Sequence, residues 1–140
     1  MLLNFDKASG LLPAVIQESG TGKVLMLGFM NAEALEKTLA TGYATFFSRS
    51  RNRLWVKGES SGHLLKVRDV LVDCDLDTVL IVAEQLGPGT CHNGYQSCFY
   101  RRIQTGELVE AETRVFDPKK VYAGSPASAS QRVADRAGQE

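Results

Sequence analysis

The sequence is poor in the residues from which most metal and nucleophile sites are assembled, since its 140 residues include three cysteines and two histidines. Three cysteines cannot all pair within one chain, which argues against a disulfide framework. No apolar run approaches the roughly eighteen residues of a membrane span, and the first residues do not resemble a secretory leader. We therefore expect a cytoplasmic protein whose cysteines remain thiols.

The chain also lacks an excess of charge of either sign, because Lys plus Arg and Asp plus Glu both number 16. No global field draws it toward nucleic acid or an anionic membrane, so we expect neither as a partner. Its length and 44% hydrophobic content suit one domain. We place that domain at residues 1–122, and we expect 123–140 to be a flexible tail because it has hardly any large apolar residue.

Turn-forming residues and apolar runs predict a strand at 15–17, a strand at 24–30 and a hairpin between them. A helix over 32–40 follows. Its sequence is rich in Ala, Leu, Glu and Lys, with Asn31 as a good N-cap and Gly42 placed to end it.

Further strands are predicted at 45–48 and 54–57, around a basic turn. Leu, Val and Ile dominate three later stretches, which we also expect to be strands: 64–74, 78–86 and 98–103. The fold class is therefore α+β, a mostly antiparallel sheet with one well-defined helix.

An acidic run places Asp73, Asp75 and Asp77 at alternate positions around Cys74. In an extended chain the three carboxylates would share one face and the thiol would point to the other, whereas a helix would spread the carboxylates apart. Hard oxygen ligands suit Mg²⁺ or Ca²⁺ and thiolate suits Zn²⁺, so two metals are plausible. The alternative is a solvated acidic loop at the end of a strand. An EF-hand is disfavoured, because Thr78 stands where that loop needs glycine.

The other two cysteines, Cys91 and Cys98, lie in a glycine-rich loop that we expect to lead into a strand. Their spacing from each other and from Cys74 does not match zinc fingers, ribbons or knuckles, which disfavours a nucleic-acid-binding module. Three thiolates would leave a fourth zinc position for water, as a catalytic site requires. Two alternatives stay open: small buried cysteines without a metal, and a non-catalytic zinc site closed by a fourth ligand such as His92.

Both histidines lie in glycine-containing loops, and His92 directly follows Cys91. Loop placement favours a functional role, and we take His92 as the candidate general base. A nucleotide deaminase is disfavoured, because neither histidine begins His-x-Glu and no Pro-Cys-x-x-Cys occurs.

Four segments in this order, 48–51, 54–63, 73–77 and 91–99, closely resemble phosphoribosyl-AMP cyclohydrolase, the histidine-biosynthesis enzyme that opens the adenine ring. The resemblance runs from about residue 24 to about residue 122. One departure is Asn93, which stands where the family pattern leads us to expect Thr.

The resemblance implies which residues hold metals and how the chain assembles. Cys74, Cys91 and Cys98 correspond to the family's zinc ligands, and the three aspartates correspond to its magnesium ligands. Family members are homodimers with the zinc site shared across the interface. We accordingly expect a zinc-dependent homodimer in which Cys74 meets the partner's Cys91 and Cys98.

The implied reaction is attack of zinc-activated water at C6 of phosphoribosyl-AMP and cleavage of the N1–C6 bond, which gives the phosphoribosyl-formimino-AICAR-phosphate product. His92 is the expected base. The two phosphates of this small-molecule substrate need positive or hydrogen-bonding partners. The candidates are Arg49, Arg51, Lys57, Ser60, Ser61 and His63.

Overall fold

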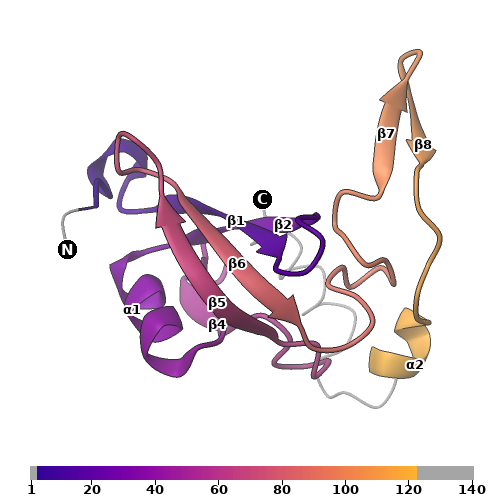
Figure 1. Ribbon diagram of the computed structural model, residues 1–140, viewed down its shortest axis with the longest axis horizontal. Coiled ribbons are helices and arrows are strands. Elements are labelled where there is room, and N and C mark those ends of the chain that lie inside the picture. The colour runs from indigo at the N-terminus through magenta and orange to yellow at the C-terminus, as the bar shows by residue number, and fades with distance from the viewer. Residues whose placement is uncertain (1–2, 123–140) are drawn as a thin grey trace.

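The computed structural model describes residues 3–122, so the predicted tail at 123–140 lies outside the described residues. After a short 3₁₀ helix, η1 (Asp6–Ala8), four strands form the main sheet: β1 (Leu12–Glu18), β2 (Val24–Met30), β5 (Leu65–Val72) and β6 (Val79–Gln85). The sheet order is β2-β1-β6-β5 (Figure 1). The β1–β2 and β5–β6 pairs are antiparallel, while β1 and β6 run parallel. The predicted α+β class with mostly antiparallel pairing is confirmed, and the sheet has one parallel pair.

The predicted helix is present as α1 (Ala32–Thr41). The Asn31 side chain accepts a hydrogen bond from the Ala34 N–H at 2.8 Å, which satisfies one of the free donors of the first turn. Gly42 ends the helix in a left-handed conformation (φ 81°) and donates to the Thr38 carbonyl at 3.0 Å. Both caps were therefore predicted from the sequence.

A second hairpin, β3 (Thr45–Ser48) and β4 (Arg53–Val56), packs beside the main sheet. Gly28 on β2 allows this packing, because a Cβ there would lie 2.5 Å from the Phe46 ring. The core lies between α1, this hairpin and one face of the sheet, and alternate sheet residues point into it. Its fully buried large side chains include Leu12, Ile16, Leu25, Phe46, Leu65 and Ile81.

Beyond the main sheet, the structure corrects the predicted strand at 98–103. The strand begins later, as β7 (Arg101–Gln104), and pairs with β8 (Glu107–Glu110) in a hairpin that stands away from the sheet (Figure 1). Residues 98–100 are instead held in a loop, since the Cys98 N–H donates to Leu25 and the Phe99 N–H to the Ser97 hydroxyl. Every residue of β7 and β8 is exposed. Because neither face of this hairpin is buried, its sequence shows no alternation of apolar and polar residues from which the strands could be predicted.

A five-residue helix, α2 (Pro118–Tyr122), was also not predicted. Within residues 3–122, neither this helix nor any other has the length and apolar character to cross a membrane.

Candidate functional site

The acidic run forms the turn between β5 and β6, which agrees with the alternative of an acidic loop at the end of a strand and not with an extended chain. The Asp73 carboxylate accepts hydrogen bonds from the backbone N–H groups of Asp77 (3.0 Å) and Thr78 (3.2 Å). Leu76 adopts a left-handed conformation (φ 63°). An aspartate that bonds the backbone ahead of it competes with strand pairing and closes a turn, which is the physical reason for the difference.

The turn nevertheless brings the three carboxylates together. Asp73, Asp75 and Asp77 can each offer an oxygen within 4.8 Å of the others. The Lys7 ammonium nitrogen lies 2.9 Å from Asp75 and 3.0 Å from Asp77. Hydrogen bonds from Lys7 lower the pKa of Asp75, and those to the two aspartates raise the pKa of Lys7. The Lys7 ammonium therefore contacts two of the three carboxylates. A donor set made only of oxygens fits Mg²⁺ or Ca²⁺.

Cys91 and Cys98 are brought together by the loop that follows β6. Cys91 is buried and Cys98 is half-buried. The Cys91 N–H donates to Tyr95 (3.1 Å), and the Gly94 N–H returns to the Cys91 carbonyl (3.0 Å). The Cys98 thiol hydrogen-bonds to Cys91, which lowers the pKa of Cys91 to about 6 and, with burial, raises that of Cys98. The pair is a ready soft-ligand set, with one sulfur easily deprotonated.

The third thiol is elsewhere in the chain. Cys74 is exposed on the acidic turn, which precedes β6, whereas Cys91 and Cys98 lie beyond the other end of that strand. A strand of this length spans roughly 20 Å at about 3.3 Å per residue. One chain therefore supplies two of the three predicted zinc ligands at one place and the third at another.

His63 joins the loop at 57–64 to the cysteine loop. Its Nδ1 lies 3.1 Å from the Gly89 carbonyl, and its ring meets Phe116 edge to face at 4.8 Å. A Cβ on Gly87 would come within 2.8 Å of the same ring, so the contact is close. Burial lowers the pKa of His63. His92 is half-buried between Cys91 and Asn93 in the cysteine loop.

The predicted substrate residues fall into two groups. Arg49 and Arg51 lie in the turn between β3 and β4, where the Arg49 guanidinium covers the Phe29 ring at 4.3 Å. Lys57, Ser60, Ser61 and His63 lie in or beside the loop between β4 and β5. Ser60 is exposed and Ser61 is half-buried, and the Ser61 hydroxyl accepts from the His63 N–H at 3.1 Å. Lys57 differs from the others because it is only 6% exposed.

Lys57 is also the cation whose charge reaches the cysteine loop. It contributes to lowering the pKa of His63, behind burial, and it favours the charged forms of both Cys91 and Cys98. Its ammonium nitrogen lies 5.7 Å from the centre of the Trp55 ring. The bond between His63 and Gly89 joins the loop that follows Lys57 to the cysteine loop, and the acidic turn lies at the other end of β6.

An aromatic pair that we did not predict supports the cysteine loop. Tyr95 and Tyr100 are stacked, with ring centres 3.6 Å apart and planes at 2°. The Asn93 amide donates to the Tyr100 hydroxyl at 3.2 Å, so this departure from the family pattern has a partner of its own. Cys91 and Cys98 pack against the pair. The stack has no sequence signature, because it forms inside an irregular loop without periodicity.

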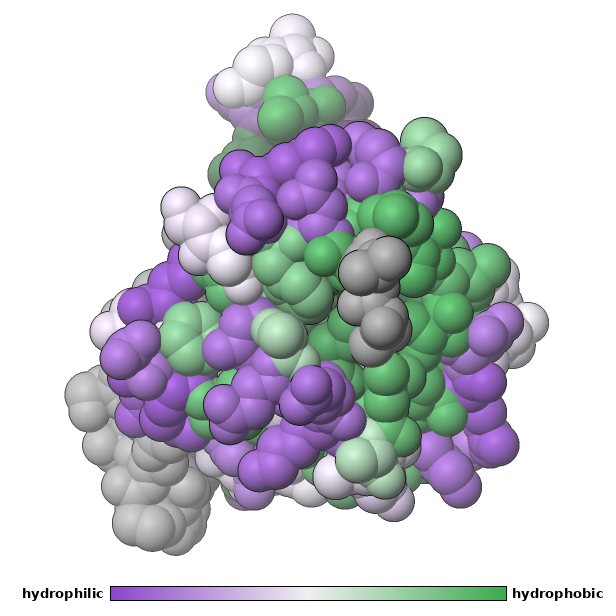
Figure 2. All heavy atoms as spheres, turned by 90° about the vertical axis from the view of Figure 1, so that its left-hand side faces the viewer, coloured by the Kyte–Doolittle hydropathy of each residue, from purple (hydrophilic) through white to green (hydrophobic). Residues whose placement is uncertain are grey.

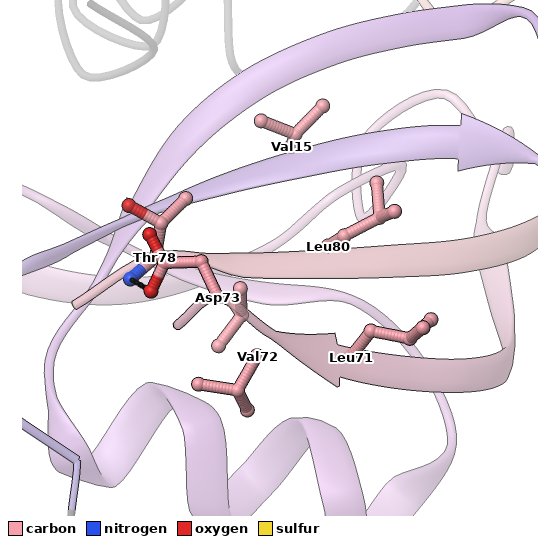
Figure 3. A pocket seen from close by; sticks show the side chains of 7 residues that line it. Val15, Leu71, Val72, Asp73, Thr78 and Leu80 are labelled. Carbon is pink, nitrogen blue, oxygen red and sulfur yellow. Dashed lines mark hydrogen bonds between the residues drawn. The ribbon is translucent and has the colours of Figure 1, made fainter. Parts of the chain in front are cut away.

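A groove of about 360 Å³ lies beside the acidic turn (Figure 3). Its floor is apolar: Val15, Leu80 and Leu71 stand opposite one another across β1, β6 and β5. Asp73 and Thr78 line its end. Figure 2 shows apolar side chains gathered in one broad area of the face it presents. Exposed apolar faces are a common feature of surfaces through which proteins associate.

Comparison with known proteins gives one family. The model of the phosphoribosyl-AMP cyclohydrolase family matches residues 26–100, a span that contains every predicted site residue. The chain is 56% identical to a phosphoribosyl-AMP cyclohydrolase of Solibacter usitatus, over 89% of this chain and 98% of the relative. It is 56% identical to one of Nitratidesulfovibrio vulgaris (85% and 94%) and 54% identical to one of Desulforapulum autotrophicum (86% and 97%).

Proposed function

The chain belongs to the phosphoribosyl-AMP cyclohydrolase family, and from this premise we propose that it hydrolyses phosphoribosyl-AMP in histidine biosynthesis by attack at C6 and cleavage of the N1–C6 bond. The observation that carries the proposal is the cysteine loop, which brings Cys91 and Cys98 together and is joined to His63 through the Gly89 carbonyl.

The described residues fit two metals of different chemistry. Cys91 and Cys98, with a third thiolate from Cys74, would hold Zn²⁺, and the three aspartates of the turn would hold Mg²⁺. Zinc, when bound, would supply water activated for attack at neutral pH. Magnesium would place positive charge beside a phosphate of the substrate.

His92 is the proposed general base. It follows Cys91 directly and is half-buried, so its imidazole can stay beside the zinc site while keeping access to solvent and substrate. It would take a proton from the attacking water and return one to N1 as the N1–C6 bond breaks. The proton and the new C6–oxygen bond together account for the water consumed.

Phosphate binding is assigned to exposed and half-buried polar groups of the two loops. The Arg49 guanidinium lies 4.3 Å from the centre of the Phe29 ring, and its planar fork of N–H donors suits a phosphate. Arg51, Ser60, Ser61 and His63 are the other proposed contacts. The Phe29 ring under Arg49 lies on β2, the strand whose Leu25 carbonyl accepts a hydrogen bond from the Cys98 N–H.

A second copy of the chain would complete the site. Cys74 is exposed at the edge of the apolar groove, and the groove is lined by the same turn that carries it. A partner seated on the sheet face formed by Val15, Leu71 and Leu80 would therefore lie next to Cys74. This supports a homodimer in which Cys74 of one protomer joins Cys91 and Cys98 of the other.

Mixing two inactive variants tests the shared site. Cys74→Ser and Cys91→Ser should each be inactive, but a mixed dimer has one intact site, formed by Cys74 of one chain and the loop cysteines of the other. Random mixing after denaturation and refolding should restore about a quarter of the wild-type activity, since half the dimers are mixed and each has one good site. If all three ligands came from one chain, mixing would restore nothing.

Turnover itself is measured by the change in ultraviolet absorbance as the purine ring opens. Purified protein with Zn²⁺ and Mg²⁺ should convert phosphoribosyl-AMP. Absence of turnover in protein that retains zinc would favour the second reading of the cysteines, a non-catalytic zinc site closed by four ligands.

A further inference from the structure

The Lys7 side chain reaches the acidic turn from a segment far away in the sequence. Its ammonium nitrogen lies 2.9 Å from a carboxylate oxygen of Asp75 and 3.0 Å from one of Asp77. Lys7 belongs to η1, and the residues just before η1 are joined to the same turn by a 2.6 Å hydrogen bond from the Asn4 N–H to the Leu76 carbonyl. The fold itself therefore places a positive charge against two of the three carboxylates.

The backbone around Lys7 is fixed independently of this contact. The Gly10 N–H donates to the Phe5 carbonyl at 2.8 Å, and the Phe5 side chain packs against the core. The Lys7 side chain is 49% exposed, and those of Asp75 and Asp77 are 54% and 24% exposed. Exposed ion pairs are weak because water competes for both partners. The ammonium can therefore leave the carboxylates without movement of the main chain.

The ammonium and a divalent ion would compete for the same oxygens. Lys7 holds Oδ2 of Asp77, whose other oxygen accepts a hydrogen bond from the Thr78 hydroxyl at 3.4 Å. Oδ2 is thus the oxygen of Asp77 that is best placed for a metal. The ammonium offsets one negative charge of the turn, whereas Mg²⁺ would offset two and would take oxygens from all three aspartates. Because two cations at one set of oxygens repel each other, one must leave when the other binds.

We propose that Lys7 is a tethered cation at the metal position of the acidic turn: its ammonium pairs with Asp75 and Asp77 when no divalent ion is bound, and Mg²⁺ binds by displacing it. Lys7 is therefore a positioning residue that acts through the two carboxylates and sets how tightly the turn binds a divalent ion. This inference rests on the proposed magnesium site.

The test measures Mg²⁺ binding to full-length, zinc-loaded protein without substrate. Lys7→Met keeps the apolar stem of the side chain and removes the charge, whereas Lys7→Arg keeps the charge. Lys37→Met, on the exposed side of α1, is the matched control, and Asp75→Asn reports on the magnesium site itself. The dissociation constant of Mg²⁺ comes from titration calorimetry, and the midpoint of thermal unfolding is recorded with and without Mg²⁺.

Removal of the Lys7 charge should tighten Mg²⁺ binding by about 3–10-fold, since each of two exposed ion pairs shifts an equilibrium by a factor of about 1.4–5. Without Mg²⁺, Lys7→Met should unfold at a lower temperature than wild type, and Mg²⁺ should raise its midpoint by more. Lys7→Arg and Lys37→Met should bind Mg²⁺ within about twofold of wild type. A residue that only supported the turn would instead weaken both stability and Mg²⁺ binding when lost.

Three results would overturn the inference. Unchanged Mg²⁺ affinity in Lys7→Met would reject displacement and leave the magnesium site intact. Weaker binding in Lys7→Met would make Lys7 a support of the site and not a competitor. Mg²⁺ binding that is undetectable in wild type and Lys7→Met, or undiminished in Asp75→Asn, would reject the magnesium site as well. If circular dichroism shows that Lys7→Met is unfolded, Lys7→Gln is measured in its place with the same expectation.

Discussion

His92 shows how far a single residue can be interpreted. Its position after Cys91 predicted a base, and the structure keeps it half-buried in the same loop. His92→Ala should lower kcat by about 10²–10⁴-fold, the usual contribution of a general base, while zinc content stays at the wild-type level. Steady-state kinetics and elemental analysis on the same preparation check this. Turnover at the original rate would reject the base assignment, and parallel loss of zinc would make His92 a ligand.

His63 gives a prediction about pH. Burial lowers its pKa in the folded chain, so below about pH 6.5 the unfolded chain binds more protons than the folded one. The stability that depends on neutral His63 is present above that pH and is lost as the pH falls through the lowered pKa. Urea unfolding between pH 7.5 and 5.5 should show a steeper loss of stability in wild type than in His63→Gln.

The comparison isolates His63, because both proteins share every other titrating group. Equal pH dependence of the two unfolding midpoints would contradict the expected shift. A stability of His63→Gln that is lower than wild type by the same amount at every pH would reflect only the lost hydrogen bond to the Gly89 carbonyl.

At the scale of elements, two glycines of one loop provide a matched pair. Gly58 (φ 89°) and Gly62 (φ 80°) are both left-handed, but a Cβ at Gly58 would meet the His63 backbone at 2.4 Å while one at Gly62 would meet nothing within 4 Å. Gly62→Ala should cost about 1–2 kcal/mol, the usual penalty for a left-handed alanine. Gly58→Ala should cost more and raise KM, because the loop must move away from His63. Similar unfolding midpoints of the two variants would show that the loop can move away from His63 at little cost in stability.

The acidic turn is the second element with a testable role. The Asp75 carboxylate accepts a hydrogen bond from the exposed Lys7, whereas Asp73 closes the turn by accepting from the backbone N–H groups of Asp77 and Thr78. Asp75→Asn should therefore weaken the magnesium dependence of the rate while leaving zinc content and fold unchanged. Magnesium titration of activity, with zinc measured in parallel, checks this. An unchanged magnesium requirement would count against a metal role for the turn.

For the whole molecule, the apolar sheet face predicts assembly. Leu71 in the groove is 46% exposed and Leu39 on α1 is 49% exposed, so a charge is equally tolerable at either position in a monomer. Leu71→Asp should halve the molar mass seen by light scattering and remove both zinc and activity, because Cys74 then has no partner. Leu39→Asp should change none of these. A dimer that survives Leu71→Asp would place the interface elsewhere.

Cytoplasmic location, the absence of a nucleic-acid partner and the flexible tail at 123–140 stay predictions. The homodimer and the two metals stay proposals until the mixing and metal measurements are made. Membership of the family is shown by relatives that align along most of the chain.

The sequence by itself determined the local structure and the ligand types. Helix α1 with its caps, the first hairpin and the strands around the basic turn follow from short-range propensity, and the cysteine and aspartate segments carry the family pattern. Only the tertiary structure decided that 73–77 is a turn, that β1 and β6 run parallel, that Tyr95 stacks on Tyr100, and that Lys57 is buried. These features depend on contacts between residues distant in the chain or on irregular loop backbone. Neither produces a periodic pattern of apolar residues, which is the signal from which sequence predicts structure.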